Sequence, residues 1–214
     1  MYQNLMSHQS YHQNTPHSIC HKLVFSNGIE LGRVDIITEV SELASYLILL
    51  REGHLEAVFQ IFNHLEKKHN ARIVFDPSYP DINHSSFKEC DWKSIYGDVT
   101  ESIPPNAPPP CGKDVDIRLF VDSDHAEDQC TRRSRSGFLI YLNMSPMIWY
   151  SEKQATIKTS VFGAELVAIK HEMEALRGLR YKLLMMGVPI DGSSFIFMAT
   201  TCQSCTTRSV PNQR

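Results

Sequence analysis

The sequence predicts a mixed fold, α+β or α/β, in which a three-stranded antiparallel meander is followed by a long helix and a fourth strand. Short apolar runs of strand character, with short connections between the first three, stand at 117–122, 137–142, 147–151 and 194–198. Between the third and fourth runs, apolar residues recur at helical spacing from about residue 160 to residue 186. Ser160 can cap the start of this helix, and Gly187 and Pro189 can stop it.

A mostly helical segment is expected before the meander, over residues 39–68. Two apolar stripes predict helix faces that pack in a core, the first formed by Leu43, Leu47 and Leu50 and the second by Leu55, Phe59, Phe62 and Leu65. Gly53 is expected to break or join the two helices. The run "ARIVF" at 71–75 predicts a short strand.

Composition divides the chain further. Residues 1–28 are rich in Gln, Asn, Ser and His without a clear period, which predicts an irregular leader. Residues 101–113 contain five prolines and no helical pattern, which predicts a stiff, extended linker and a domain boundary. The expected domains are therefore residues 29–100 and residues 114–197.

Charge is unevenly distributed, although the formal net charge of the whole chain is only −3. Residues 76–128 carry a net charge of −8, and residues 130–186 carry +5. This pattern fits metal ligands beside a phosphate-binding face, and it fits two ordinary solvated faces equally well.

The chain is expected to be intracellular, in the cytoplasm or the nucleus. Its first twenty residues are polar and show no signal peptide, and the longest apolar run, 43–50, is far shorter than the roughly 18 residues that span a membrane. The six cysteines have no framework spacing, which predicts free thiols in a reducing compartment.

Two carboxylates suggest chemistry. Asp122 ends the first predicted strand, and Glu165 lies in the first turn or two of the long helix. If the helix packs across the sheet, the two groups can converge, as they must to hold two Mg²⁺ ions for hydrolysis of a phosphodiester. Acidic residues at strand ends and on helices are also common as simple solvated groups, so this pair alone is a weak signal.

The amino-acid sequence around these two residues is a far more specific signal than the pair alone. Segments 121–142, "VDSDHAEDQCTRRSRSGFLIYL", and 146–169, "PMIWYSEKQATIKTSVFGAELVAI", resemble the ribonuclease H domain of copia-type retrotransposons. The family's motifs are Asp-x-Asp-x-Ala, Thr-Arg-Arg-Ser-x-Ser-Gly, Trp-x-Ser-x-Lys-Gln and Ala-Glu. The matching residues are Asp122, Asp124, Ala126, Thr131, Arg132, Arg133, Ser134, Ser136, Gly137, Trp149, Ser151, Lys153, Gln154, Ala164 and Glu165.

Upstream, the segment from "IELGRVDIITEV" to "VFQIFNHL" resembles the thumb-like end of the copia-type reverse transcriptase, with His54 and Leu55 at the family's His and following amphipathic helix. The resemblance covers residues 29–197 and implies a ribonuclease H-like fold after the linker. The polymerase motif Tyr-x-Asp-Asp is absent from this sequence, so the chain cannot polymerise.

The resemblance also implies roles for single residues. Asp122 and Glu165 become catalytic ligands of two Mg²⁺ ions, with an RNA/DNA hybrid as substrate. Asp124 either supports the metal ligands or caps a turn. Arg132 and Arg133 either contact phosphate or form a solvated hairpin surface.

Aromatic and basic groups beyond that loop have similar open roles. Either Trp149 or Tyr150 can stack on a nucleotide, but not both, because neighbouring residues of a strand face opposite sides. On the long helix, Arg177, Arg180 and Lys182 face either a phosphate backbone or water.

The predicted site is incomplete. The family ends its fourth strand with an aromatic residue and Gly-Asp-Asn-x-Ser-Val, but here Ala199 stands where the third carboxylate belongs. Reading the gene from the third base of the Phe197 codon permits Tyr-Gly-Asp-Asn and a family-like continuation to the end. Residues 198–214 are thus hypothesised to be out of frame, which makes "CQSC" at 202–205 accidental; an absent open frame in the genomic DNA would refute this.

The sequence therefore predicts a fragment of a retrotransposon polyprotein whose ancestral activity, hydrolysis of RNA in an RNA/DNA hybrid, is largely lost. The rest of the polyprotein would be its partner in the parent element, and no membrane partner is expected. Two alternatives are a nucleic-acid binding module without turnover and a pseudogene product that folds poorly because a partial sheet exposes an unpaired edge.

Overall fold

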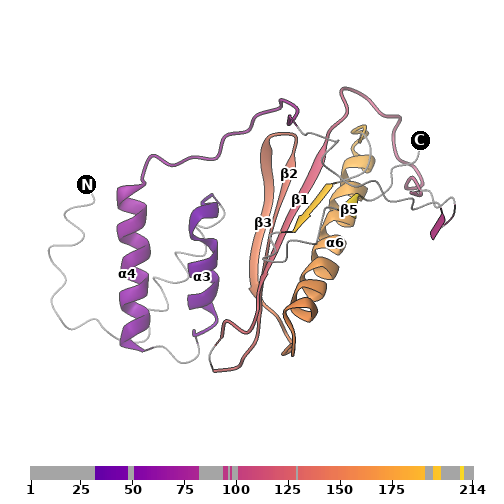
Figure 1. The fold of residues 1–214 in the computed structure, drawn as a ribbon. Coiled ribbons are helices and arrows are strands. Elements are labelled where there is room, and N and C mark those ends of the chain that lie inside the picture. Colours follow the sequence, from indigo (N-terminus) through magenta and orange to yellow (C-terminus); the bar gives the residue numbers. More distant parts are fainter. Residues whose placement is uncertain are drawn as a thin grey trace. The chain divides into compact units, whose positions relative to one another are not determined.

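The computed structural model describes residues 32–47, 51–81, 94–95, 97, 101–128, 130–190, 195–198 and 208–209, the last two ranges as backbone only. Contacts divide the chain into two compact units, Met1–Ile73 and Val74–Arg214. Figure 1 shows the elements of both units. No helix in the described part of the chain has the length and apolar character that crossing a membrane requires.

The first unit is helical. It contains a 3₁₀ turn η1 at Val34–Ile36 and two helices, α3 at Ile37–Ala44 and α4 at Glu52–Lys67. Their apolar side chains recur at helical spacing and form one buried cluster, made of Ile36, Val40, Leu43, Leu55, Val58 and Ile61. The predicted helical segment is thus confirmed within the described residues, as two separate helices.

Two details of the first unit differ from the prediction. Gly53 does not separate the helices, because α4 already begins at Glu52 and Gly53 lies in its first turn. Phe59 does not join the core but is 41% exposed, since the buried row of α4 runs through Leu55, Val58 and Ile61. Leu50 lies outside the described residues.

No strand forms at 71–75, so that prediction is wrong. Val74 and Phe75 are exposed, and an apolar run without a partner strand has no ladder to join. The chain that follows is bonded instead to Ser145, whose hydroxyl donates to the Asp76 carbonyl at 2.8 Å.

The second unit contains the predicted meander, helix and fourth strand (Figure 1). Its strands are β1 at Ile117–Asp124, β2 at Arg135–Leu142, β3 at Ser145–Lys153, β4 at Phe195–Met198 and β5 at Arg208–Ser209. The sheet order is β3-β2-β1-β4-β5, in which β1, β2 and β3 are antiparallel neighbours, β4 is parallel to β1, and β5 is antiparallel to β4. The meander, helix and strand predicted from the sequence are therefore present in the predicted order.

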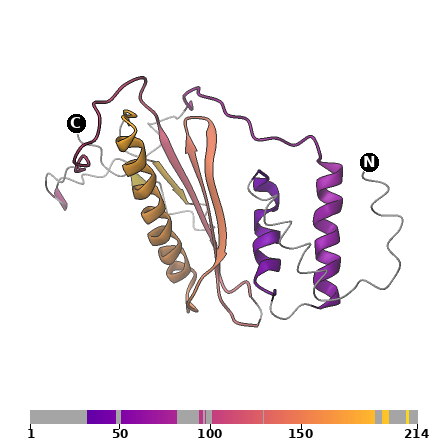
Figure 2. The ribbon, with the colours of Figure 1, turned by 180° about the vertical axis from the view of Figure 1, so that it is seen from behind.

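Helix α6 spans Val161–Met185 and lies along one face of this sheet (Figures 1 and 2). The Ser160 hydroxyl accepts a hydrogen bond from the Gly163 N–H at 3.1 Å, so Ser160 caps the helix as predicted. The core between helix and sheet contains Ile117, Leu119, Val121, Ile140, Ala168, Leu176 and Leu183. Because side chains alternate along a strand, Arg118, Phe120 and Asp122 belong to the opposite face of β1.

The Pro-rich segment is part of the second unit and does not run freely between two domains. It is bonded to the end of α6, where the Glu101 carboxylate pairs with Arg180 at 2.6 Å and the Cys111 N–H donates to the Gly187 carbonyl at 2.8 Å. The division between the units therefore lies at Ile73/Val74, ahead of the expected linker at 101–113.

Gly187 gives a direct test of this attachment. Its φ is +72°, and a Cβ atom built on it would lie 3.2 Å from Pro108 Cγ and 3.2 Å from the Pro109 carbonyl oxygen. We expect Gly187→Ala to lower the free energy of unfolding by about 1–3 kcal/mol, because alanine strains this left-handed backbone and crowds the prolines.

Urea unfolding measures this change, and Gly178→Ala is the matched control. Gly178 lies within α6 with open space around its Cα atom, so alanine there should stabilise by about 0.5–1 kcal/mol. A loss of stability of equal size in both variants would contradict the role given to Gly187.

Candidate functional site

The carboxyl end of β1 carries two of the predicted site residues, Asp122 and Asp124. Both side chains are exposed, and Asp122 Oδ1 accepts a hydrogen bond from the Ser123 N–H at 2.8 Å. Strand alternation places both on the face away from α6, because Val121 lies in the core with that helix. The described contacts show no turn-capping bond from Asp124.

Glu165 lies in the second turn of α6 and is half-buried. Its neighbour Ala164 is fully buried. Glu172 and Leu176 lie seven and eleven residues after Glu165, on the same side of the helix, and both are buried. Since Leu176 is in the core with β1, Glu165 belongs to the side of α6 that faces the sheet.

The structure brings Asp122 and Glu165 to one end of the second unit. The carboxyl end of β1 and the amino-terminal end of α6 lie together in both views (Figures 1 and 2). Asp122 lies on the face of the sheet away from α6, however, whereas Glu165 lies on α6 itself. A ligand that both carboxylates contact would therefore have to lie beyond the end of β1. No three His, Cys, Asp or Glu side chains of the described residues gather as a metal-binding group.

This end of β1 is also where the order of the sheet reverses. The chain runs outward through β2 and β3, crosses by α6, and returns as β4 on the other side of β1. In open sheets, ligands bind outside the carboxyl ends of strands at such a switch point. In the parallel pair, Val121 is the partner of Met198, so the next residues in sequence are Asp122 on one side and Ala199 on the other, the latter outside the described residues.

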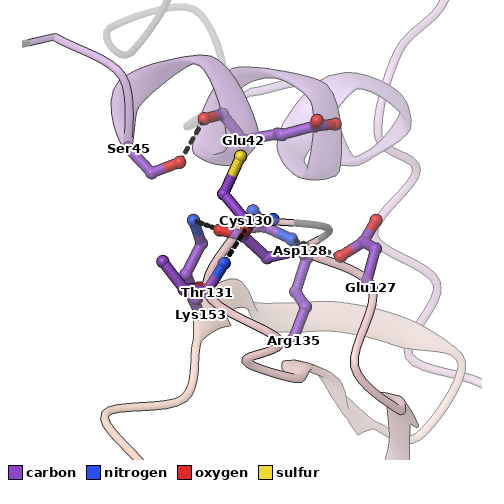
Figure 3. Close-up of polar contacts among 8 residues, drawn as sticks. All are labelled: Glu42, Ser45, Glu127, Asp128, Cys130, Thr131, Arg135 and Lys153. Atoms are coloured by element: carbon purple, nitrogen blue, oxygen red, sulfur yellow. Dashed lines mark hydrogen bonds and ion pairs between the residues drawn. The ribbon is translucent and has the colours of Figure 1, made fainter. Parts of the chain in front are cut away.

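The loop from β1 to β2 is built around Asp128, whose contacts are drawn in Figure 3. One carboxylate oxygen accepts hydrogen bonds from the Cys130 and Thr131 N–H groups, each at 2.9 Å, and the other pairs with the Lys153 ammonium. The Lys153 hydrogen bond and the backbone N–H of Thr131 lower the pKa of Asp128, so this carboxylate is charged at neutral pH. These contacts connect the backbone at Cys130 and Thr131 to Lys153 at the end of β3.

This loop presents the two predicted phosphate-binding residues. Arg132 and Arg133 are both exposed, and Arg132 has a φ of +56°, an uncommon backbone conformation that the Asp128 contacts support. Arg135, by contrast, is buried and its Nε donates to Glu127 at 3.1 Å. Arg132 and Arg133 thus have the exposure that contact with a phosphate needs.

Trp149 and Tyr150 point to opposite faces of β3, as strand alternation predicts. Tyr150 is on the α6 side, where its ring lies 5.6 Å from that of Phe138 and its hydroxyl donates to Glu152. Trp149 is half-buried on the other face, opposite Leu139 of β2. It lies on the same face of the sheet as Asp122.

The predicted basic row on α6 is only partly available to a ligand. Arg177 and Lys182 are exposed, but Arg180 is buried and bound by Glu101. Arg180 thus forms an ion pair with Glu101, in place of the phosphate backbone or the water that was expected beside it. This pairing could not be predicted, because Glu101 lies far from Arg180 in the sequence, in the Pro-rich segment.

Three buried polar side chains escaped the sequence reasoning. Asp128 holds the β1–β2 loop, and Gln154 connects β2 with α6 through two hydrogen bonds of its side chain. Glu172 is only 2% exposed, and burial, together with the charge of Glu152, raises its pKa to about 7. Lys153 and Gln154 stand in the motif Trp-x-Ser-x-Lys-Gln, which was a usable signal, whereas nothing in the sequence distinguishes Glu172 from solvated glutamates.

No protein-family model, no curated protein and no solved structure matches this chain. The motifs in the sequence and the order of the elements in the second unit both indicate the end of β1 as the candidate site.

Proposed function

We propose that this chain is a fragment of a copia-type retrotransposon polyprotein, with the end of a reverse transcriptase followed by an incomplete ribonuclease H domain. The observation that carries the proposal is the position of Asp122 at the switch point of a sheet ordered β3-β2-β1-β4, with Glu165 on the helix that crosses it. The ancestral reaction would be Mg²⁺-dependent hydrolysis of the RNA strand of an RNA/DNA hybrid.

The residues present do not fit a pair of Mg²⁺ ions. Hard cations held about 3.5–4 Å apart need several carboxylate oxygens between them. This chain offers Asp122 and Glu165, while Ala199 stands where the third carboxylate belongs.

The first test is a cleavage assay on an RNA/DNA hybrid in Mg²⁺, followed on a denaturing gel. We expect the full chain to cleave no faster than a blank, because the metal charges would be under-compensated by two carboxylates. Asp122→Asn is expected to leave this result unchanged. Clear cleavage that Asp122→Asn abolishes would contradict the inactivity proposed here, although it would support the ancestry.

A second candidate function is binding of an RNA/DNA hybrid without turnover. It is favoured by the exposed Arg132 and Arg133 on a loop that Asp128 holds in place. A backbone that is already held by such contacts loses less conformational freedom when the arginines on it contact a phosphate. Trp149, on the same face as Asp122, is the candidate for stacking on a base.

This second candidate predicts a specific salt dependence. Removing both charges with Arg132→Ala and Arg133→Ala should weaken hybrid binding and reduce the slope of log affinity against log salt by about 1–2. Fluorescence anisotropy over a series of salt concentrations measures this slope. Lys67→Ala, an exposed charge on α4, is the control and should lower the slope less; an equal reduction would mean that binding is diffuse.

A further inference from the structure

We propose that residues 71–75, "ARIVF", are a processing site, at which an endoprotease that takes apolar side chains on both sides of the scissile bond separates the two units. The cut lies at the bond between Ile73 and Val74, where the division between the units falls. This proposal goes beyond the proposed function and does not depend on it, because it involves neither Asp122 nor Glu165.

The backbone of this junction segment, residues 71–75, forms neither a helix nor a strand. Among the described residues, no hydrogen bond involves the four consecutive residues from Arg72 to Phe75. A protein that binds an extended peptide as an added strand pairs with its backbone N–H and C=O groups. These four residues offer such groups without any prior local unfolding.

Hydrogen bonds hold the chain on both sides of this unbonded stretch. Before it, the Ala71 N–H donates to the Lys68 carbonyl, at the end of α4, at 3.0 Å. After it, the Asp76 and Pro77 carbonyls accept hydrogen bonds from side chains of the β2–β3 hairpin, at 2.8 and 3.0 Å. Cleavage is therefore expected within the junction segment and not in the chain directly before or after it.

The side chains of the junction segment supply apolar groups next to the scissile bond. Val74 is 62% exposed and Phe75 is 66% exposed, and neither belongs to the buried cluster of the second unit. A chain that only connects two units is often polar, because polar side chains stay solvated at such boundaries. Exposed apolar side chains are what the pockets of a protease bind, since burying them removes apolar surface from water.

The position of the segment favours cleavage over binding to another kind of strand-binding partner. Each unit has a buried cluster of its own, and the junction segment contributes to neither, so a cut here leaves both clusters whole. Hydrolysis breaks the C–N bond between Ile73 and Val74. Water supplies a hydroxyl to the Ile73 carbonyl carbon and a hydrogen to the Val74 nitrogen.

Limited digestion of the folded full chain with thermolysin tests the site, because this protease cuts before large apolar residues. We expect the first new amino termini at Val74 and Phe75, identified by mass spectrometry. Phe162 is 69% exposed but lies within α6, so exposure alone would predict equal cleavage there. Cleavage before Phe162 should instead be slower by about 10-fold or more, because a bonded segment must open before it is cut.

Matched variants test the role of the apolar side chains. Val74→Asp combined with Phe75→Asp should slow cleavage before these two residues by about 10-fold or more, because an apolar pocket discriminates strongly against a charged group. Ile103→Asp is the control, since Ile103 is 72% exposed and its substitution should leave this cleavage unchanged. Val74→Ser combined with Phe75→Ser repeats the test without added charge, in case the aspartates lower stability.

The cleaved chain is then unfolded in urea and followed by the fluorescence of Trp149, which lies on β3. Its unfolding midpoint should equal that of the uncleaved chain. First cleavage elsewhere among the described residues, or equal rates in the unmodified and doubly substituted chains, would overturn the processing site. A lower midpoint after cleavage would overturn the claim that the cut leaves the second unit whole.

Discussion

Replacing Leu176 with alanine should lower the free energy of unfolding of the second unit by about 3 kcal/mol, within the range of about 2–5 kcal/mol for such changes in protein cores. Leu176 is 1% exposed and packs with Ile117, Leu119 and Ile140 between α6 and the sheet. The substitution removes three carbons from that core, and a packed interior closes only part of the resulting cavity.

Urea unfolding measures this change. Trp149 lies on β3, so its fluorescence reports on the second unit. Leu166→Ala is the control on the same helix, because Leu166 is 53% exposed and its loss should change stability by less than about 0.5 kcal/mol. If the two variants were equally destabilised, α6 would not be packed on the sheet by the face described.

Raising the pH through the neutral range should destabilise the second unit by way of Glu172. The pKa of this buried carboxyl is raised from 4.5 to about 7, first by its burial and second by the charge of Glu152. Below about pH 4.5 the group is protonated in both the folded and the unfolded chain, and the folded state has its full stability. Between these values the unfolded chain ionises first, so stability falls as pH rises.

The expected size of this fall is about 3 kcal/mol in total, since each unit of pKa difference corresponds to about 1.4 kcal/mol. Unfolding in urea at a series of pH values measures it, and Glu172→Gln should remove it, because the amide does not ionise. Glu174→Gln, an exposed neighbour on the same helix, should retain it. Identical pH profiles for Glu172→Gln and the unmodified chain would show that Glu172 is not buried as described.

The elements of the second unit could be predicted because their apolar residues follow the periods of strands and of a helix. Their ends could not, since β1 and β2 continue through Ser123, Asp124, Arg135 and Ser136, polar residues that pair through their backbone groups. The opposite error occurred at 71–75, where an apolar run has strand character but no neighbour to pair with. Local composition reports what a segment can form, while a strand also needs a partner.

The candidate site shows the same limit. Asp122 and Glu165 could be singled out because they stand in motifs, and their common end of the unit follows from the order of the elements. The roles of Gln154 and Arg180 could not be foreseen, because each depends on contacts with residues far away in the sequence. Glu172 is buried because the sheet packs on α6, and a glutamate in a sequence is normally expected to be exposed, so its burial could not be predicted.

The bonds between the Pro-rich segment and α6 determine where the second unit can be trimmed. A shortened chain that began at Asp114 would leave Arg180 buried without its Glu101 partner. It would also expose Gly187 and remove the hydrogen bond from the Cys111 N–H to the Gly187 carbonyl. A chain that began at Val74 would retain these bonds, and also the hydrogen bond from the Ser145 hydroxyl to the Asp76 carbonyl. Truncation within the Pro-rich segment, where the composition predicts a domain boundary, would therefore lower the stability of the second unit. Expression from Val74 onward would retain the bonds named here.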